Sequence, residues 1–162
     1  MSFFQLGSTL SGIMKKIIIA LLMLTGSTIF AQKGWITDYD TALEKAQKTQ
    51  LPVLLIFSGS DWCPPCMFFE KRILSQSVIS DACNEIFVPL YIDLPEKKFI
   101  LPEKLEVNKN LAKKFGVGTF PTIILLNSEG KILSKDSGLP WRQPQEFLDW
   151  ITENIKKSDA KK

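Results

Sequence analysis

The chain has 162 residues, with no histidine and only three cysteines. Without an imidazole it cannot carry Ser-His or Cys-His catalysis, nor a zinc site that uses histidine ligands. Three thiols are also one fewer than an all-cysteine tetrahedral zinc site needs. These absences lead us to expect no metal centre.

Net charge is small as well. Twenty basic and 17 acidic residues leave a formal charge of +3, and two of the positive charges, Lys15 and Lys16, lie in a segment that we expect to be removed. Such a balance argues against nucleic-acid binding by electrostatics. The length and the 45% hydrophobic content fit one globular domain with a sizeable core.

Residues 1–31 have the pattern of a secretory signal peptide preceded by a few upstream residues. The two lysines come before an apolar run over residues 17–24, and Ala31 is a small residue before a polar one. We expect a start at Met14, cleavage after Ala31 and an exported, periplasmic domain over residues 32–162. An uncleaved membrane anchor is the alternative, although the run is short for a membrane span. Export matters because disulfides persist outside the cytosol.

The most informative stretch is Trp62-Cys63-Pro64-Pro65-Cys66, which follows an apolar run over residues 53–57. Two thiols at this spacing can close a small disulfide ring and reopen it. At the start of a helix, Cys63 would have a lowered pKa and act as the nucleophile. Cys66, one turn further in, would be the shielded, resolving thiol.

Two other interpretations of the cysteine pair remain. A permanent disulfide between residues this close would gain little loop entropy. Half of a metal site would need ligands that the chain lacks. Between the two sulfurs, Pro64 and Pro65 remove backbone donors and stiffen the loop, which makes them candidates for tuning the redox chemistry.

Apolar runs and chain breakers predict the order of helices and strands. Helices are expected over 38–49, 64–74, 77–84, 108–115 and 143–155, and strands over 53–57, 86–93, 121–127 and 131–135. Strand–helix alternation followed by a hairpin indicates a mixed α/β sheet of four to five strands with helices on both faces. Residues 94–107 are expected to form a surface insertion, either a tolerated loop or a partner-recognition loop, and the tail after Ile155 is expected to fray.

A second motif lies far along the chain, in residues 116–122 (Gly-Val-Gly-Thr-Phe-Pro-Thr), before an apolar strand and the turn Glu129-Gly130. With this motif and the cysteine motif in this order, the chain resembles the thioredoxin superfamily over roughly residues 35–156. The stretch Gly59-Ser60-Asp61-Trp62-Cys63 is most similar to exported, single-domain thioredoxin-like proteins of bacteria. The resemblance implies the thioredoxin fold and thiol–disulfide exchange.

The resemblance also implies a cis Phe120–Pro121 bond facing the disulfide, where the backbone can pair with an extended substrate. Trp62, Phe120 and Pro121 would then form the substrate-docking surface. The sequence alone favours an ordinary trans proline at Pro121, and Trp62 could equally be a core residue.

Members of this superfamily often carry a buried acid on the strand before the cysteine motif, and residues 53–57 contain none. Asp61 and Glu70 are the nearest acids in sequence, but neither lies on that strand. The group that exchanges a proton with Cys66 therefore stays unassigned, and water is an alternative. Cys83 is either a small buried apolar residue or the site of an intermolecular disulfide.

The leading hypothesis is an exported, monomeric thiol–disulfide oxidoreductase that reduces or isomerises protein disulfides. It would use no cofactor beyond the Cys63–Cys66 disulfide and would be recharged by a membrane electron-donor protein. The alternatives are a net oxidant that donates its disulfide, and a non-catalytic binding or chaperone module with the same fold.

Overall fold

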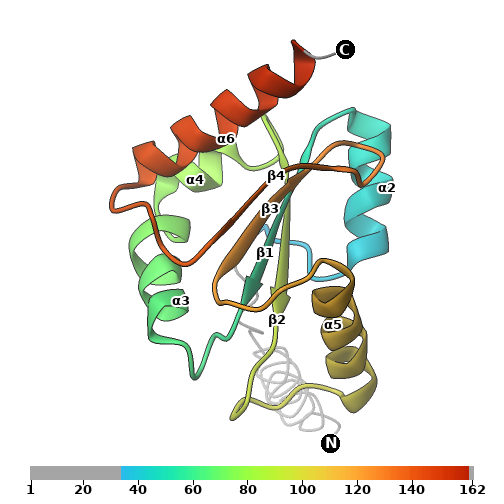
Figure 1. The fold of residues 1–162 in the computed structure, drawn as a ribbon, viewed down its shortest axis with the longest axis vertical. Coiled ribbons are helices and arrows are strands. Elements are labelled where there is room, and N and C mark those ends of the chain that lie inside the picture. The colour runs from blue at the N-terminus through green and yellow to red at the C-terminus, as the bar shows by residue number, and fades with distance from the viewer. Residues whose placement is uncertain (1–33, 161–162) are drawn as a thin grey trace, which may run out of the picture. The chain divides into compact units, whose positions relative to one another are not determined.

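The computed structural model describes residues 34–160, and its four strands form one mixed sheet in the order β2-β1-β3-β4 (Figure 1). The strands are β1 (Val53–Ser58), β2 (Val88–Asp93), β3 (Thr122–Leu126) and β4 (Ile132–Ser137). Strand β1 runs parallel to β2 and antiparallel to β3, which pairs with β4 as an antiparallel hairpin. The predicted signal peptide and its cleavage after Ala31 fall outside the described residues and stay predictions.

Helices cover both faces of this sheet, which confirms the predicted architecture. They are α2 (Tyr39–Thr49), α3 (Pro64–Phe69) with its π-helical continuation η2 (Glu70–Leu74), α4 (Ser77–Ala82), α5 (Pro102–Lys114) and α6 (Pro144–Asp159). Helices α3, α4 and α6 lie on one side and α2 and α5 on the other (Figure 1). None of the helices within residues 34–160 is long and apolar enough to cross a membrane.

Strand β1 is the centre of the core, because its side chains are buried on both faces of the sheet. Leu54 and Ile56 pack among the residues of α3, α4 and α6, whereas Leu55 and Phe57 pack against α2 and α5. A strand covered on both faces has no solvent-facing side, which explains the uninterrupted apolar run in the sequence.

Pro89 lies inside β2, where a missing backbone N–H could break the ladder. Its carbonyl points to the outer edge of the sheet and accepts a hydrogen bond from the N–H of Ile36 at 3.0 Å. The absent donor of Pro89 faces the same outer edge, away from β1. The pairing between β1 and β2 therefore keeps its hydrogen bonds, and Ile36 extends the edge by a single bridge to Leu90.

Two predicted helix boundaries were wrong. Helix α5 begins at Pro102, not at Asn108 or Asn110, because a proline suits the first helical position and Glu103 stabilises the first turn. The predicted insertion at 94–107 is thus a loop only up to residue 101. Helix α6 continues to Asp159 and does not fray after Ile155.

Candidate active site

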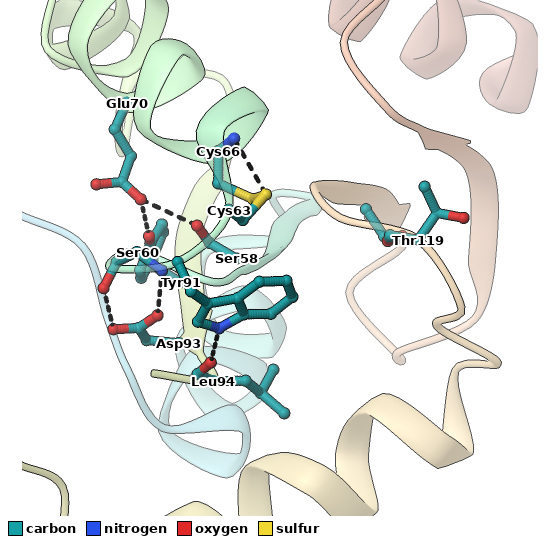
Figure 2. The surroundings of a disulfide bond; sticks show 11 residues. Ser58, Ser60, Cys63, Cys66, Glu70, Tyr91, Asp93, Leu94 and Thr119 are labelled. Atoms are coloured by element: carbon teal, nitrogen blue, oxygen red, sulfur yellow. Dashed lines mark hydrogen bonds between the residues drawn. A yellow bond between two sulfur atoms is a disulfide. The ribbon is translucent and has the colours of Figure 1, made fainter. Parts of the chain in front are cut away.

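The cysteine pair lies where the chain leaves β1 and enters α3. Cys63 is the N-cap of α3 with extended backbone angles, and Pro64 fills the first helical position. The Sγ of Cys63 is bonded to the Sγ of Cys66, with the two Cα atoms 5.2 Å apart (Figure 2). The backbone N–H of Cys66 donates to the Sγ of Cys63 at 3.3 Å. A helix-start N–H aimed at a sulfur stabilises its thiolate when the disulfide is reduced.

The two cysteines differ in their access to solvent. Cys63 retains 4% of its surface and Cys66 has none exposed. Cys63 is therefore the more accessible of the two, which is consistent with the predicted order of nucleophile and resolving thiol. Within residues 34–160, no three histidine, cysteine, aspartate or glutamate side chains gather in a way that could hold a metal ion.

Trp62 is held by three contacts beside the cysteine pair. Its ring lies so close to Gly59 that a Cβ at that position would be 2.6 Å from the indole nitrogen. Its Nε1–H donates to the carbonyl of Leu94 at 2.7 Å, and its ring meets that of Phe120 edge-on at 5.3 Å. Trp62 is therefore a fixed part of the site surface, which favours the docking interpretation over simple core packing.

The second motif reaches the site through Phe120, whose ring contacts that of Trp62. The Phe120–Pro121 bond is cis, the isomer that the family resemblance implies. The Thr122 hydroxyl donates to the carbonyl of Thr119 at 2.6 Å, which stabilises the turn before the proline. Figure 2 shows Thr119 across the cysteine pair from Glu70. The structure thus brings together Trp62, Phe120 and the cysteines from segments far apart in the sequence.

Of the two candidate acids, only Glu70 turns toward β1. The Ser58 hydroxyl, at the end of β1, donates to the Glu70 carboxylate at 2.9 Å, and the Tyr91 hydroxyl from β2 donates to the same oxygen (Figure 2). Glu70 lies one helical turn after Cys66, and its backbone N–H donates to the Cys66 carbonyl. A carboxylate from η2 thus lies at the end of β1, a strand that carries no acid of its own. Asp61 instead binds backbone N–H groups of the loop after β2.

Sequence reasoning missed Ser58 and Tyr91. Ser58 is the polar residue that ends an apolar strand, and only 1% of its surface is exposed, so its hydroxyl needs a partner. Burial, and next the nearby Glu70 carboxylate, raise the pKa of Tyr91 far above its usual value. Tyr91 therefore keeps its proton and serves Glu70 as a donor. The one signal in the sequence was a tyrosine and a serine at the carboxyl ends of two adjacent apolar runs.

Cys83 follows α4 and packs against the core on the α6 side of the sheet. Desolvation raises its pKa to about 11, against a smaller opposing effect of the Lys45 charge. This environment favours the structural interpretation of Cys83 over a reactive thiol.

A mixed sheet covered on both faces, with a cysteine pair at a helix start and a cis proline just before β3, defines a thioredoxin-fold protein with a redox-type disulfide. Residues 39–154 match the family model described as "Thioredoxin-like domain", and the chain belongs to this family.

Individual relatives support this assignment. The chain is 34% identical over 95 residues to the thioredoxin-related protein DsbJ of Chlamydia pneumoniae, covering 59% of this chain and 27% of that protein. It is 30% identical over 98 residues to the disulfide bond reductase DsbH of the same organism, covering 60% and 59%. A solved structure of a DsbH oxidoreductase superimposes with a TM-score of 0.68 at 26% identity, covering 75% of this chain and 83% of that one. The matches thus span less than two thirds of the two curated relatives.

The raised pKa of Cys83 leads to a prediction about its reactivity. Because its thiol stays protonated until the pH approaches about 11, iodoacetamide at pH 8 should modify Cys63 of the reduced, folded protein at least tenfold faster than Cys83. Peptide mass spectrometry over a time course measures both rates. Unfolding in urea is the control and should make the two rates similar. Equal rates in the folded protein would contradict the assignment of Cys83 as a half-buried structural thiol.

Proposed function

We propose that this chain is a thiol–disulfide oxidoreductase that reduces or isomerises protein disulfides. The observation that carries the proposal is the pair itself: the slightly exposed Cys63 at a helix start, bonded to a fully buried Cys66 whose N–H reaches the Cys63 sulfur. A relative that matches 60% of this chain at 30% identity is named a disulfide bond reductase, which supports the reducing direction.

The reaction follows from this geometry in two balanced steps. The Cys63 thiolate attacks one sulfur of the substrate disulfide, forming a mixed disulfide and expelling the other substrate sulfur as a thiolate that takes up a proton. The Cys66 thiol then loses its proton and attacks the Cys63 sulfur, which releases the second substrate thiol. The Cys63–Cys66 disulfide seen here is the product state. A reductant must then return two electrons and two protons.

The docking surface in this proposal consists of Trp62, Phe120 and Pro121. The edge-on contact between the Trp62 and Phe120 rings joins the cysteine loop to the loop before β3. An extended substrate would lie over these rings with its disulfide above Cys63. Pro64 and Pro65, both exposed in the first turn of α3, would tune the cysteine pair by limiting the flexibility of its loop.

Export and recharging by a membrane electron donor also belong to the proposal. Their support is the pair of lysines followed by the apolar run at residues 17–24, together with a small residue at Ala31. Outside the cytosol no cytosolic thiol system reaches the disulfide, so the electrons would have to come across a membrane.

Turnover should depend on both active-site sulfurs. We expect Cys63→Ser to abolish reduction of insulin by dithiothreitol above the uncatalysed rate, because no nucleophile remains. Cys66→Ser should also lose turnover. When the reduced variant is mixed with insulin without dithiothreitol, it should trap the substrate on Cys63 as a mixed disulfide visible by mass spectrometry. Cys83→Ser is the matched control and should keep wild-type turnover. Turnover that survives in both active-site variants would rule out the cysteine pair as the catalytic group, and a wild-type protein without turnover would leave the non-catalytic binding module.

We further propose that Glu70 accepts the proton of Cys66 in the second step. Its carboxylate is the acidic group that Ser58 and Tyr91 hold at the end of β1, one helical turn beyond Cys66. A positioned acid–base group of this kind typically contributes a factor of about 100 or more to a rate.

Glu70→Gln keeps the shape of the side chain but cannot take the proton. We expect turnover to fall by about tenfold or more, and the mixed disulfide to accumulate during turnover because its resolution is the step that slows. Quenched-flow alkylation with mass spectrometry measures that accumulation. Glu103→Gln, at the exposed start of α5, removes the same charge as a control. A slower variant without accumulation would assign Glu70 to another step.

A further inference from the structure

The loop after β2, residues 94–98, is tied to the cysteine loop by a dense set of hydrogen bonds. The carboxylate of Asp61, two residues before Cys63, accepts the backbone N–H groups of Glu96 at 3.0 Å, Lys97 at 2.8 Å and Lys98 at 2.6 Å. Three consecutive N–H groups around one carboxylate form a charge-assisted clamp. Although desolvation pushes the pKa of Asp61 upward, these N–H groups together lower it below its usual range.

A second set of bonds continues this clamp into the rest of the fold. The Lys98 ammonium donates to the Ser60 hydroxyl at 2.9 Å, and that hydroxyl donates to the Asp93 carboxylate at 2.6 Å. The buried side-chain amide of Asn108, in α5, donates to the Asp93 carbonyl at 2.7 Å. Figure 2 shows the Ser60 and Asp93 part of this network beside the cysteine pair. The cysteine loop, the 94–98 loop and α5 are therefore joined.

Trp62 depends directly on this network, because its indole N–H is bound by the carbonyl of Leu94. Leu94 is held on one side by its own N–H, which donates to the Ser58 carbonyl at 2.8 Å. On the other side the chain runs within two residues into the segment that Asp61 binds. Pro95 between them limits the backbone of Leu94 further. The position of the Leu94 carbonyl, and with it that of the Trp62 ring, is thus set by Asp61 on one side and by Ser58 on the other.

We propose that Asp61 is a positioning residue for substrate docking: by clamping residues 96–98 it fixes the Trp62 ring beside Cys63, so that extended protein disulfides bind and small disulfides gain nothing from it. This inference rests on the proposed function and deepens it, because it names a residue that sets the preference for protein substrates. Asp61 does not touch the reacting sulfurs, and its effect passes through Leu94 and Trp62.

The test compares Asp61→Asn with Glu96→Gln in the full chain. An asparagine has one acceptor oxygen in place of two, so at least one of the three N–H groups loses its partner. Glu96→Gln removes one negative charge from the same loop but leaves every backbone donor in place. Steady-state kinetics would be measured with two substrates, a disulfide-bonded peptide and hydroxyethyl disulfide, and amide hydrogen exchange would report on residues 96–98.

We expect Asp61→Asn to raise KM for the peptide by up to roughly tenfold, because a loosened Trp62 ring must then be ordered when the peptide binds, with kcat little changed. Its rate with hydroxyethyl disulfide should stay within about twofold of wild type, and exchange at residues 96–98 should accelerate. Glu96→Gln should match wild type in all three measurements.

Three results would overturn the inference while wild-type turnover stays intact. An unchanged peptide KM in Asp61→Asn, in spite of faster hydrogen exchange at residues 96–98, would show that the clamp does not govern docking. Equal effects of Asp61→Asn and Glu96→Gln would show that only net charge matters. Equal losses of activity on the peptide and on hydroxyethyl disulfide would show that Asp61 acts on the cysteines. If the wild-type protein reduces neither disulfide, the proposed function itself fails.

Discussion

The whole site depends on one constraint: the chain must leave β1 and start α3 with the Cys63 sulfur within reach of the Cys66 N–H. That hydrogen bond, at 3.3 Å, needs Cys63 in an extended N-cap conformation and Cys66 in the first turn of the helix. Both are possible because β1 is buried on both faces and gives the turn a rigid starting point. Helix α3 is anchored in turn by Phe69, which is almost fully buried in the core.

Around this turn the structure supplies from distant segments what the local sequence lacks. Strand β1 has no acid, and Glu70 on the following helix reaches back to its last residue, Ser58, with Tyr91 of β2 as a second donor. The loop after β2 supplies the carbonyl that holds Trp62 and the N–H groups that bind Asp61. The carboxyl ends of two adjacent parallel strands therefore provide most of the polar contacts of the site, as is usual for open α/β sheets.

Features that depend on local sequence could be predicted, and features that depend on distant contacts could not. The β1 strand, the helix starting at Pro64 and the cysteine pair follow from runs and spacings within a few residues. The start of α5 was missed because Asn108 has the side chain of a good N-cap but is buried inside the helix, where it donates to the Asp93 carbonyl. The Glu70 and Asp61 contacts join residues 12 to 37 positions apart, which no local pattern encodes.

The most direct test of the account is the reduction potential of the Cys63–Cys66 pair. The protein would be equilibrated with glutathione buffers of known ratio, and the reduced fraction would be measured by alkylation and mass spectrometry. A reductant of protein disulfides should have a midpoint well below the cytosolic glutathione poise of roughly −220 to −260 mV. A midpoint near about −120 mV, where strong disulfide donors lie, would contradict the account and favour an oxidant.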